Sequence, residues 1–427
     1  MSKKNNIRDQ LAILGAHPTR SNSFPPWPQF DREEEENLLQ VLRSRKWERH
    51  GGSMVSKFEQ RFAELCGVEK SLMVTNGSTA LEIALTVAGV GAGDEVLVPP
   101  YTFMSTVMSV LLVNALPVFI DIHPDTYCID PRQIEEHIGP NTKAIIPVHL
   151  AGMPSDMEKI MDIASKHNIT VIEDACQAHL SEWNGQKVGS VGKLGCFSFQ
   201  VSKNISAGEG GAIISKNPDL TDRCFYYHTC GRLRAGMWYF HPHPGTNRRM
   251  TEFQAAVLLA QIERVQDQTA RRSDNAVYLS EKLSQIPGIS PLSVPDFVTR
   301  HAHHLYIFRY DAEAFDGLPR DTFVKALQAE GIPCSKGYVP LYKEEFIKKT
   351  IKIRKFQNIF GSTRINQYYK YLSDLRCPVT EKASREEGVW VPQPPLLGKK
   401  EDMDTIAEAI QKIREYGREL NQIYKGK

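Results

Sequence analysis

A lysine at position 203 lies between a short apolar run and a glycine-rich turn, in the segment Ser198-Phe-Gln-Val-Ser-Lys203-Asn-Ile-Ser-Ala-Gly208-Glu-Gly-Gly211. Such glycines let the backbone pass close to a ligand. A lysine amine that a buried or cation-rich site keeps neutral is nucleophilic and forms an imine with an aldehyde. A single lysine in a turn is more often a solvated loop residue, so the prediction depends on the residues that accompany it.

An aspartate at position 174 ends a second apolar run, at residues 170–174. Ligands of open α/β sheets gather at the carboxyl ends of the strands. A carboxylate there can keep a pyridinium nitrogen protonated, so that the ring accepts electrons from a substrate carbanion. The alternative is an aspartate that caps the next turn. Together with Lys203, Asp174 is predicted to carry the chemistry.

The segment Thr75-Asn-Gly77-Ser78-Thr79 ends another apolar run and begins a helical pattern. Backbone N–H groups and hydroxyls at a helix N-terminus can converge on a phosphate, although Gly-Ser-Thr is also ordinary N-cap chemistry. Phe103 follows a further run and can stack on a flat ring or belong to the core. A pyridoxal 5′-phosphate site needs a phosphate loop, a stacking aromatic residue, an aspartate, a lysine and a glycine turn. This chain has all five, in that order.

Short apolar runs that alternate with helical patterns must position these residues. The runs occupy residues 71–75, 95–99, 117–122, 144–150, 170–174, 196–200 and 211–215. Such alternation predicts an α/β fold with a mostly parallel seven-stranded sheet. Residues 78–88 place Leu81, Ala84 and Leu85 on one face, which predicts a helix after the first strand.

We expect three parts along the chain: a proline-rich N-terminal arm at 1–30, a large domain at 31–265 and a small C-terminal α/β domain at 266–427. The boundary falls along a helical pattern that begins at Thr251, where Thr251 and Gln254 form a possible capping box. The small domain is predicted to contain a helix, a strand, a helix, loops and a last helix, at residues 276–285, 304–310, 320–330 and 402–424.

The composition narrows the class of protein. The 427 residues include 52 basic and 50 acidic side chains, a net charge of +2, which favours neither nucleic acid nor an anionic membrane as a partner. The eight cysteines form no C-x-x-C pair, which is typical of a reducing cytoplasm. No apolar run has the length of a signal peptide or approaches the roughly 20 residues that span a bilayer, so we expect a soluble protein.

Three alternatives concern other parts of the sequence. The histidines at 241, 243, 301, 303 and 304 lack carboxylates or cysteines at a zinc-site spacing, so no metal is predicted. The lysines at 343, 348, 349, 352 and 355 form either a solvated face or a surface for an anionic partner such as a nucleotide-linked sugar. A non-catalytic regulatory relative stays open, because a fold does not fix a function.

The motifs around Lys203 and Asp174 resemble the DegT/DnrJ/StrS family of aminotransferases from about residue 25 to the C-terminus. The resemblance implies the fold type I of pyridoxal-phosphate-dependent transferases, similar to aspartate aminotransferase. It implies that Lys203 forms the imine with the cofactor, Asp174 contacts the pyridine nitrogen, Gln177 contacts the phenolic oxygen and Phe103 stacks on the ring. The residues that match phosphate contacts are Gly77, Ser78 and Ser198.

The segment from Gly245 to Glu252 resembles a family motif whose asparagine reaches the phosphate in the neighbouring subunit. Asn247 therefore implies a homodimer with shared active sites. Thr246 and Arg248 stand where the commoner motif has aromatic residues. Polar pockets gain selectivity from hydrogen bonds to substrate oxygens. The candidates for such substrate contacts are His179, Arg232, Tyr239 and His241.

Two branches of the family resemble this chain. The segments Trp27-Pro-Gln-Phe, His228-Thr-Cys-Gly-Arg232 and Tyr239-Phe-His241 are similar to 3-amino-5-hydroxybenzoate synthases, whereas residues 126–131 and 144–150 are similar to inosose aminotransferases. A dehydratase branch has histidine in place of the imine-forming lysine, so Lys203 argues against it.

The resemblance predicts transfer of an amino group from L-glutamine or L-glutamate to a keto-sugar or keto-cyclitol, in aminosugar, aminocyclitol or antibiotic biosynthesis. Lys203 would serve as both covalent anchor and general base. A free inosose, a nucleotide-linked keto-sugar and a ring precursor that becomes aromatic all stay open as acceptors.

Overall fold

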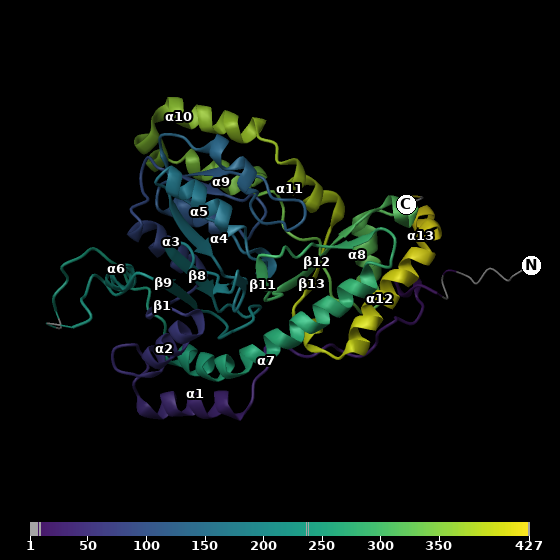
Figure 1. Ribbon diagram of the computed structural model, residues 1–427, viewed down its shortest axis with the longest axis horizontal. Helices are drawn as coiled ribbons and strands as arrows, with labels where there is room; N and C mark the ends of the chain where they lie inside the picture. The colour runs from purple at the N-terminus through teal and green to yellow at the C-terminus, as the bar shows by residue number, and fades with distance from the viewer. Residues whose placement is uncertain (1–6, 8–9, 236, 238, 426–427) are drawn as a thin grey trace, which may run out of the picture.

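A computed structural model describes residues 7, 10–235, 237 and 239–425 of the chain (Figure 1). Residues 1–6 and 8–9 of the expected arm, and residues 426–427 of the expected small domain, lie outside the described residues. The long helix α7 (Glu252–Leu283) runs from the large sheet on one side of the molecule to a smaller sheet on the other.

The large sheet has seven strands, and all but one are parallel. β9 (Gly211–Ser215) is antiparallel to both of its neighbours, β1 (Lys70–Val74) and β8 (Leu194–Ser198). The order continues from β8 through β5 (Thr170–Asp174), β4 (Thr142–Ile145), β2 (Glu95–Val98) and β3 (Leu116–Phe119). Each of the seven apolar runs forms a strand, so the predicted sheet is confirmed.

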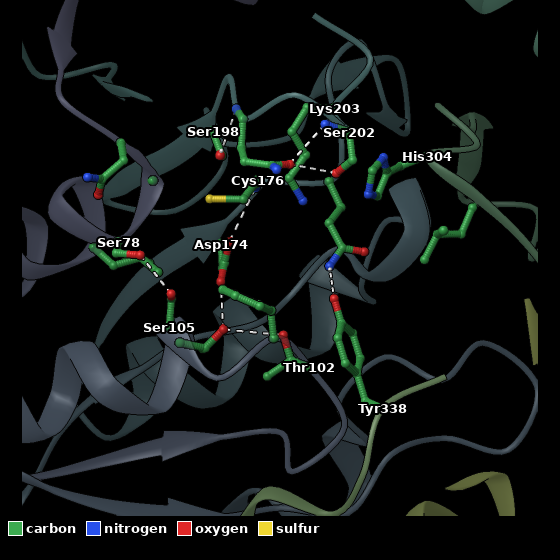
Figure 2. Close-up of a pocket in the computed structure, with 18 of the residues that line it drawn as sticks. Ser78, Thr102, Ser105, Asp174, Cys176, Ser198, Ser202, Lys203, His304 and Tyr338 are labelled. Atoms are coloured by element: carbon green, nitrogen blue, oxygen red, sulfur yellow. Dashed lines mark hydrogen bonds between the residues drawn. The ribbon is translucent and has the colours of Figure 1, made fainter. Parts of the chain in front are cut away.

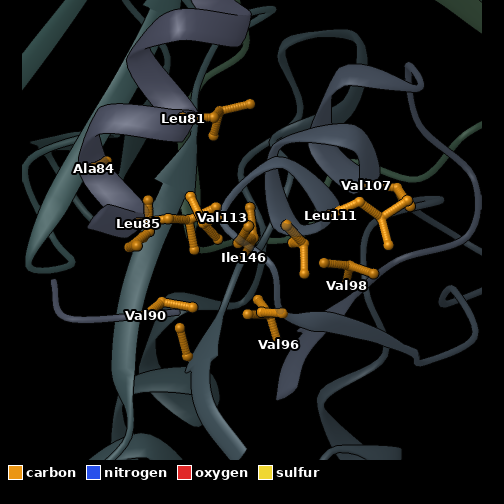
Figure 3. Close-up of a cluster of buried hydrophobic side chains, with 14 of the residues drawn as sticks. Leu81, Ala84, Leu85, Val90, Val96, Val98, Val107, Leu111, Val113 and Ile146 are labelled. Atoms are coloured by element: carbon orange, nitrogen blue, oxygen red, sulfur yellow. The ribbon is translucent and has the colours of Figure 1, made fainter. Parts of the chain in front are cut away.

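Helices cover both faces of this sheet, which is why its strands are almost continuously apolar. In β1, Leu72 and Val74 pack into the cluster of α3 (Gly77–Val87), whereas Met73 packs on the other face, with α7. Figure 3 shows side chains of α3 and of α4 (Ser105–Leu112) packed with those of β2. The other covering helices are α1 (Arg32–Ser44), α2 (Met54–Cys66), α5 (Met157–Lys166) and α6 (Pro218–His228).

The helix α7 is one unbroken element of 32 residues. It begins with the predicted capping box, in which Thr251 and Gln254 satisfy each other's backbone groups. The separate helix expected at residues 276–285 is wrong, because these residues continue α7: no glycine or proline stands between residues 252 and 286 to stop it. The expected domain boundary at residue 265 falls inside this helix and stays a prediction.

The small sheet orders β10 (Ile289–Pro291), β12 (Leu305–Tyr310) and β13 (Gly388–Pro392). The predicted strand and the predicted helix after it are confirmed as β12 and α8 (Arg320–Ala329). The C-terminal helix is divided at Tyr416 into α12 (Lys400–Glu415) and α13 (Gly417–Lys425). The arm packs against this part of the molecule: Leu11 lies in its core, and the buried Glu330 accepts hydrogen bonds from Ala12 N and Thr19 N, both at 2.9 Å.

Residues 345–374 form helices where the sequence predicted loops. α9 (Glu345–Ile351) and α10 (Arg354–Asp374) pack Ile347, Phe356 and Tyr368 into the core of the large sheet. Gly361, with φ of 74°, kinks α10 and interrupts its apolar period, which hid the helix from the sequence pattern. The remaining elements are α11 (Pro378–Lys382) and a small sheet of β11 (Val298–Arg300), β6 (Glu182–Trp183) and β7 (Gln186–Lys187).

Within residues 10–425, leaving aside positions 236 and 238, each helix is too short or too polar to cross a bilayer.

Candidate active site

A cavity of about 650 Å³ lies at the carboxyl edge of the large sheet (Figure 2). The segments that follow β1, β2, β5 and β8 all reach it, because these strands point the same way. Seven of the predicted site residues line this one cavity: Gly77, Ser78, Phe103, Asp174, Gln177, Ser198 and Lys203.

Lys203 and Asp174 come from neighbouring parallel strands. Asp174 ends β5, where its backbone pairs with Cys196 of β8, and Lys203 lies in the turn after β8, with its N–H bonded to Gln200 O at 2.9 Å. The Lys203 side chain is half-buried, and burial lowers the pKa of its amine, while Cys176 and Asp174 oppose that shift. A lowered pKa enlarges the neutral, nucleophilic fraction of the amine.

The N-terminus of α3 forms one end of the cavity. Asn76 caps the helix by accepting from Thr79 N at 2.9 Å, and the Ser78 hydroxyl donates to Ser105 Oγ at 2.6 Å. A Cβ on Gly77 would lie 2.8 Å from both Cys176 Sγ and Ser198 Cβ, so only glycine fits there. Exposed N–H groups, the helix dipole and serine hydroxyls make this end suitable for a phosphate.

The middle of the cavity has an aromatic face and an amide. Phe103 is 52% exposed in the chain, which leaves its ring free to stack on a flat ligand. Gln177 accepts from Ala151 N at 2.8 Å and donates from Nε2 to the Tyr338 hydroxyl at 3.1 Å. An amide nitrogen carries two hydrogens, so Gln177 can also donate to a ligand oxygen.

The structure adds lining residues that the sequence analysis missed. Thr102, Ser105 and Thr106 flank Phe103, and this run of hydroxyls directly after a strand was a signal that could have been used. Asn76, Leu81, Cys176, Gln200, Ser202 and Glu209 lie beside the predicted motifs. Four more reach the cavity from distant parts of the chain and gave no local signal: His304, Leu305, Tyr338 and Trp390. Burial, with Lys203 nearby, holds the pKa of His304 well below its ordinary value, so its imidazole is neutral.

His179 is placed in the core and not in the cavity lining. Its ring packs against Phe197 and Phe199, each at 5.6 Å between centroids. Burial lowers its pKa to about 3. The predicted contact of His179 with substrate has no support from this placement.

Four more predicted residues lie in the segment between α6 and α7, which extends away from the sheets at the left of Figure 1. Tyr239 is 76% exposed, and His241 Nδ1 lies 2.7 Å from the Cys230 carbonyl oxygen. Asn247 is exposed and pairs through its backbone with Thr229. Within one chain, neither these residues nor Arg232 line the cavity, and their roles stay predictions.

The lining residues fit pyridoxal phosphate. A phosphorylated pyridine aldehyde needs an anion site, a carboxylate for the ring nitrogen, a flat apolar contact and an amine for the aldehyde. The cavity supplies all four, through the α3 N-terminus, Asp174, Phe103 and Lys203. In the part of the chain that the structure describes, no three His, Cys, Asp or Glu side chains are grouped so as to hold a metal.

This fold and this site define a pyridoxal-phosphate-dependent aminotransferase of fold type I. Residues 28–359 match the profile of the DegT/DnrJ/EryC1/StrS aminotransferase family, and the chain belongs to this family.

Relatives of known name cover the chain almost completely. It is 35% identical over 425 residues to the L-glutamine:2-deoxy-scyllo-inosose aminotransferase of Streptoalloteichus tenebrarius, covering 96% of this chain and 99% of that protein. It is 33% identical over 393 residues to the 3-amino-5-hydroxybenzoate synthase of Amycolatopsis mediterranei, covering 92% and 97%. A crystal structure of 3-amino-5-hydroxybenzoic acid synthase superposes with a TM-score of 0.82 at 33% identity, covering 92% of this chain and 99% of that one.

Proposed function

We propose that this aminotransferase moves the amino group of L-glutamine to the ketone carbon of an uncharged cyclitol, a scyllo-inosose. The observation that carries the aminotransferase chemistry is the convergence of Lys203 and Asp174 on one cavity from adjacent strands. Relatives named as L-glutamine:2-deoxy-scyllo-inosose aminotransferases, 33 to 35% identical to this chain, support the choice of donor and acceptor.

The charge of the cavity supports an uncharged acceptor. Its charged lining residues are Lys203, Asp174 and Glu209, and its remaining polar side chains are hydroxyls, amides, a thiol, an indole and a neutral imidazole. A nucleotide-linked sugar carries a diphosphate that is normally bound by arginine or lysine. The hydroxyls and amides that line this cavity within one chain suit the hydroxyls of a cyclitol.

Bound pyridoxal phosphate supplies an aldehyde that takes up an amino group and a ring that accepts electrons. The residues of the chain then have separate tasks. The α3 N-terminus binds the phosphate, Asp174 holds a proton on the ring nitrogen, and Gln177 donates to the phenolic oxygen. The Lys203 amine, whose pKa burial lowers, removes the proton from the donor's α-carbon and returns a proton at the carbon that receives the nitrogen.

The functional unit in this proposal is a homodimer with shared sites. The segment that carries Arg232, Tyr239, His241 and Asn247 does not line the cavity of its own chain, although its last part pairs with the end of β1, where Thr75 N donates to Arg248 O at 3.0 Å. Its exposed apolar side chains suit a contact with a second copy, Met237 being 75% and Phe240 45% exposed. A reducing cytoplasm is the proposed compartment, because all eight cysteines are free thiols.

A second candidate is an aromatising dehydration, as the name of 3-amino-5-hydroxybenzoate synthase indicates for that relative. To test both, the holoenzyme is incubated with L-glutamine and 2-deoxy-scyllo-inosose, and the aminocyclitol is measured by mass spectrometry. The proposal expects an aminated product that is absent with Lys203→Ala. Loss of two waters from 2-deoxy-scyllo-inosose to give an ultraviolet-absorbing aromatic ring, without amination of the inosose, would favour the second candidate.

A further inference from the structure

Two threonine hydroxyls lead to Asp174, one from Thr106 in the first turn of α4 and one from Thr102 just before that helix (Figure 2). Thr106 Oγ1 donates to Asp174 Oδ2 at 2.8 Å, and Thr102 Oγ1 lies 3.2 Å from Thr106 Oγ1. Both threonines are 1% exposed and line the cavity. The other carboxylate oxygen, Oδ1, accepts from Cys176 N at 3.2 Å. Each oxygen of the carboxylate therefore has a protein donor.

The direction of these hydrogen bonds follows from the carboxylate. An ionised carboxylate only accepts, so the single hydrogen of the Thr106 hydroxyl points to Asp174. Thr106 Oγ1 is then an acceptor for the hydroxyl of Thr102. Hydrogen bonds in such a chain polarise one another, and donation to a carboxylate stabilises its ionised form.

We infer that Thr106 is a positioning residue, supported by Thr102, that fixes the orientation of the Asp174 carboxylate so that the proton stays on the ring nitrogen of the cofactor. This inference rests on the proposed role of Asp174. Without this donor the carboxylate would be free to rotate, and its contact with the ring nitrogen would hold the ring proton less firmly. The ring would then accept electrons less well, and the Lys203-dependent proton transfer would slow.

The same short segment serves the other end of the cavity. Ser105, one residue before Thr106, accepts from Ser78 at the phosphate end. The start of α4 therefore contacts both the anion site and the aspartate, and Phe103 lies just before it. Different side chains of this segment make these contacts, so loss of a single hydroxyl removes one contact and keeps the others.

The test is ¹⁵N NMR of the holoenzyme reconstituted with pyridoxal phosphate labelled at the ring nitrogen. Wild type is expected to show a protonated nitrogen, and Asp174→Asn an unprotonated one. Thr106→Val keeps the shape of the side chain and removes the hydroxyl, and we expect its signal to move towards that of Asp174→Asn. The half-reaction with L-glutamine should slow by roughly tenfold or more, while Thr106→Ser should remain near wild type.

A matched control exists elsewhere in the chain. Thr380 is fully buried, lies outside the cavity lining, and donates from Oγ1 to Asp121 Oδ1 at 2.7 Å. Thr380→Val loses the same kind of bond and should leave the ¹⁵N signal unchanged. If Thr106→Val does not retain the cofactor, Thr106→Ala removes the hydroxyl without a branched replacement and is measured in its place.

The outcomes separate the inference from the proposed function. A signal in the Thr106 variants that equals wild type, while Asp174→Asn shifts, would overturn the inference and leave the role of Asp174 intact. A wild-type nitrogen that is unprotonated, or unaffected by Asp174→Asn, would overturn both.

Discussion

Gln177 and Tyr338 are joined by a hydrogen bond of 3.1 Å although they lie 161 positions apart in the chain. The bond ties the edge of the large sheet to the segment after α8, which closes the cavity from the C-terminal side. Tyr338 also packs edge-on against Trp390, with 4.6 Å between centroids. A segment that follows β5 and two segments of the C-terminal part of the chain thus meet over the cofactor cavity.

Tyr338→Phe should weaken cofactor binding only moderately. The variant keeps the ring packing and loses one hydrogen bond to Gln177, while Ala151 N still holds the amide. A neutral bond of this kind is worth about 0.5–1.5 kcal/mol, so we expect the Kd for pyridoxal phosphate to rise roughly two- to tenfold. Equilibrium dialysis measures it. Tyr310→Phe, which loses a bond to Leu318 O in the small domain, should leave the Kd unchanged, and an equal rise there would refute the assignment.

Gly77→Ala should disrupt the phosphate end. The added Cβ would lie 2.8 Å from Cys176 Sγ and Ser198 Cβ, so the start of α3 must move. We expect at least a tenfold loss of cofactor affinity, measured by fluorescence titration of the apoenzyme. Gly91→Ala is the control, because its Cβ would meet nothing closer than 4.0 Å. Unchanged affinity in Gly77→Ala would show that the phosphate does not bind at this helix.

Because it has buried histidines, the protein should have a lower free energy of unfolding at acidic pH. Burial lowers the pKa of His179, His228 and His303 to about 3 each, from an ordinary 6.5. Below pH 6.5 the unfolded chain takes up protons that the native state refuses, so the free energy of unfolding falls as the pH falls from 6.5 towards 3. Each group contributes up to about 1.4 kcal/mol per pH unit in that window.

The variant His179→Phe removes one of these titrating groups. Phenylalanine suits this position because the His179 ring packs against Phe197 and Phe199. Between pH 7.5 and 5 the variant should lose about 2 kcal/mol less of its free energy of unfolding than wild type. Urea unfolding at the two pH values measures the difference. Parallel losses in both proteins would mean that His179 is protonated in the folded state.

Shared sites predict complementation between two inactive variants. Lys203→Ala lacks the amine, and Asn247→Ala lacks the side chain that the neighbouring subunit is proposed to supply. In a mixed dimer, one site would combine the intact Lys203 of one chain with the intact Asn247 of the other. An equal mixture that is unfolded and refolded together should recover about a quarter of wild-type activity, because half the dimers are mixed and have one intact site each. No recovery would place each site within a single chain.

The main site residues could be predicted from the sequence because they lie at the ends of strands. Asp174 is the last residue of the buried strand β5. The alternation of strands and helices places the end of that strand at the carboxyl edge of the sheet. Gly77 and Ser78 follow the same rule after β1. Lys203 lies in a turn and not at a strand end, so the strand pattern alone does not predict its role. The glycine-rich turn and the order of the other motifs identified it.

The rest of the cavity depends on packing between distant segments. His304 and Trp390 reach it because β12 and β13 pair in the small sheet, a pairing that no local pattern encodes. His179 was expected to contact the substrate because a polar side chain can bind substrate oxygens, yet it lies in the core beside Phe197. A polar residue in a core is indistinguishable by sequence from one in a pocket, since only the tertiary neighbours differ.

The absorption spectrum of the holoenzyme tests the central claim, that Lys203 binds the cofactor in a working aminotransferase. Wild type should show a band near the visible edge that bleaches when L-glutamine is added. Lys203→Ala should lose that band and show no turnover, while Lys216→Ala, an exposed lysine on the adjacent strand end, should behave as wild type. A wild-type protein that binds no pyridoxal phosphate, or whose bound cofactor reacts with no amino acid, would contradict the account.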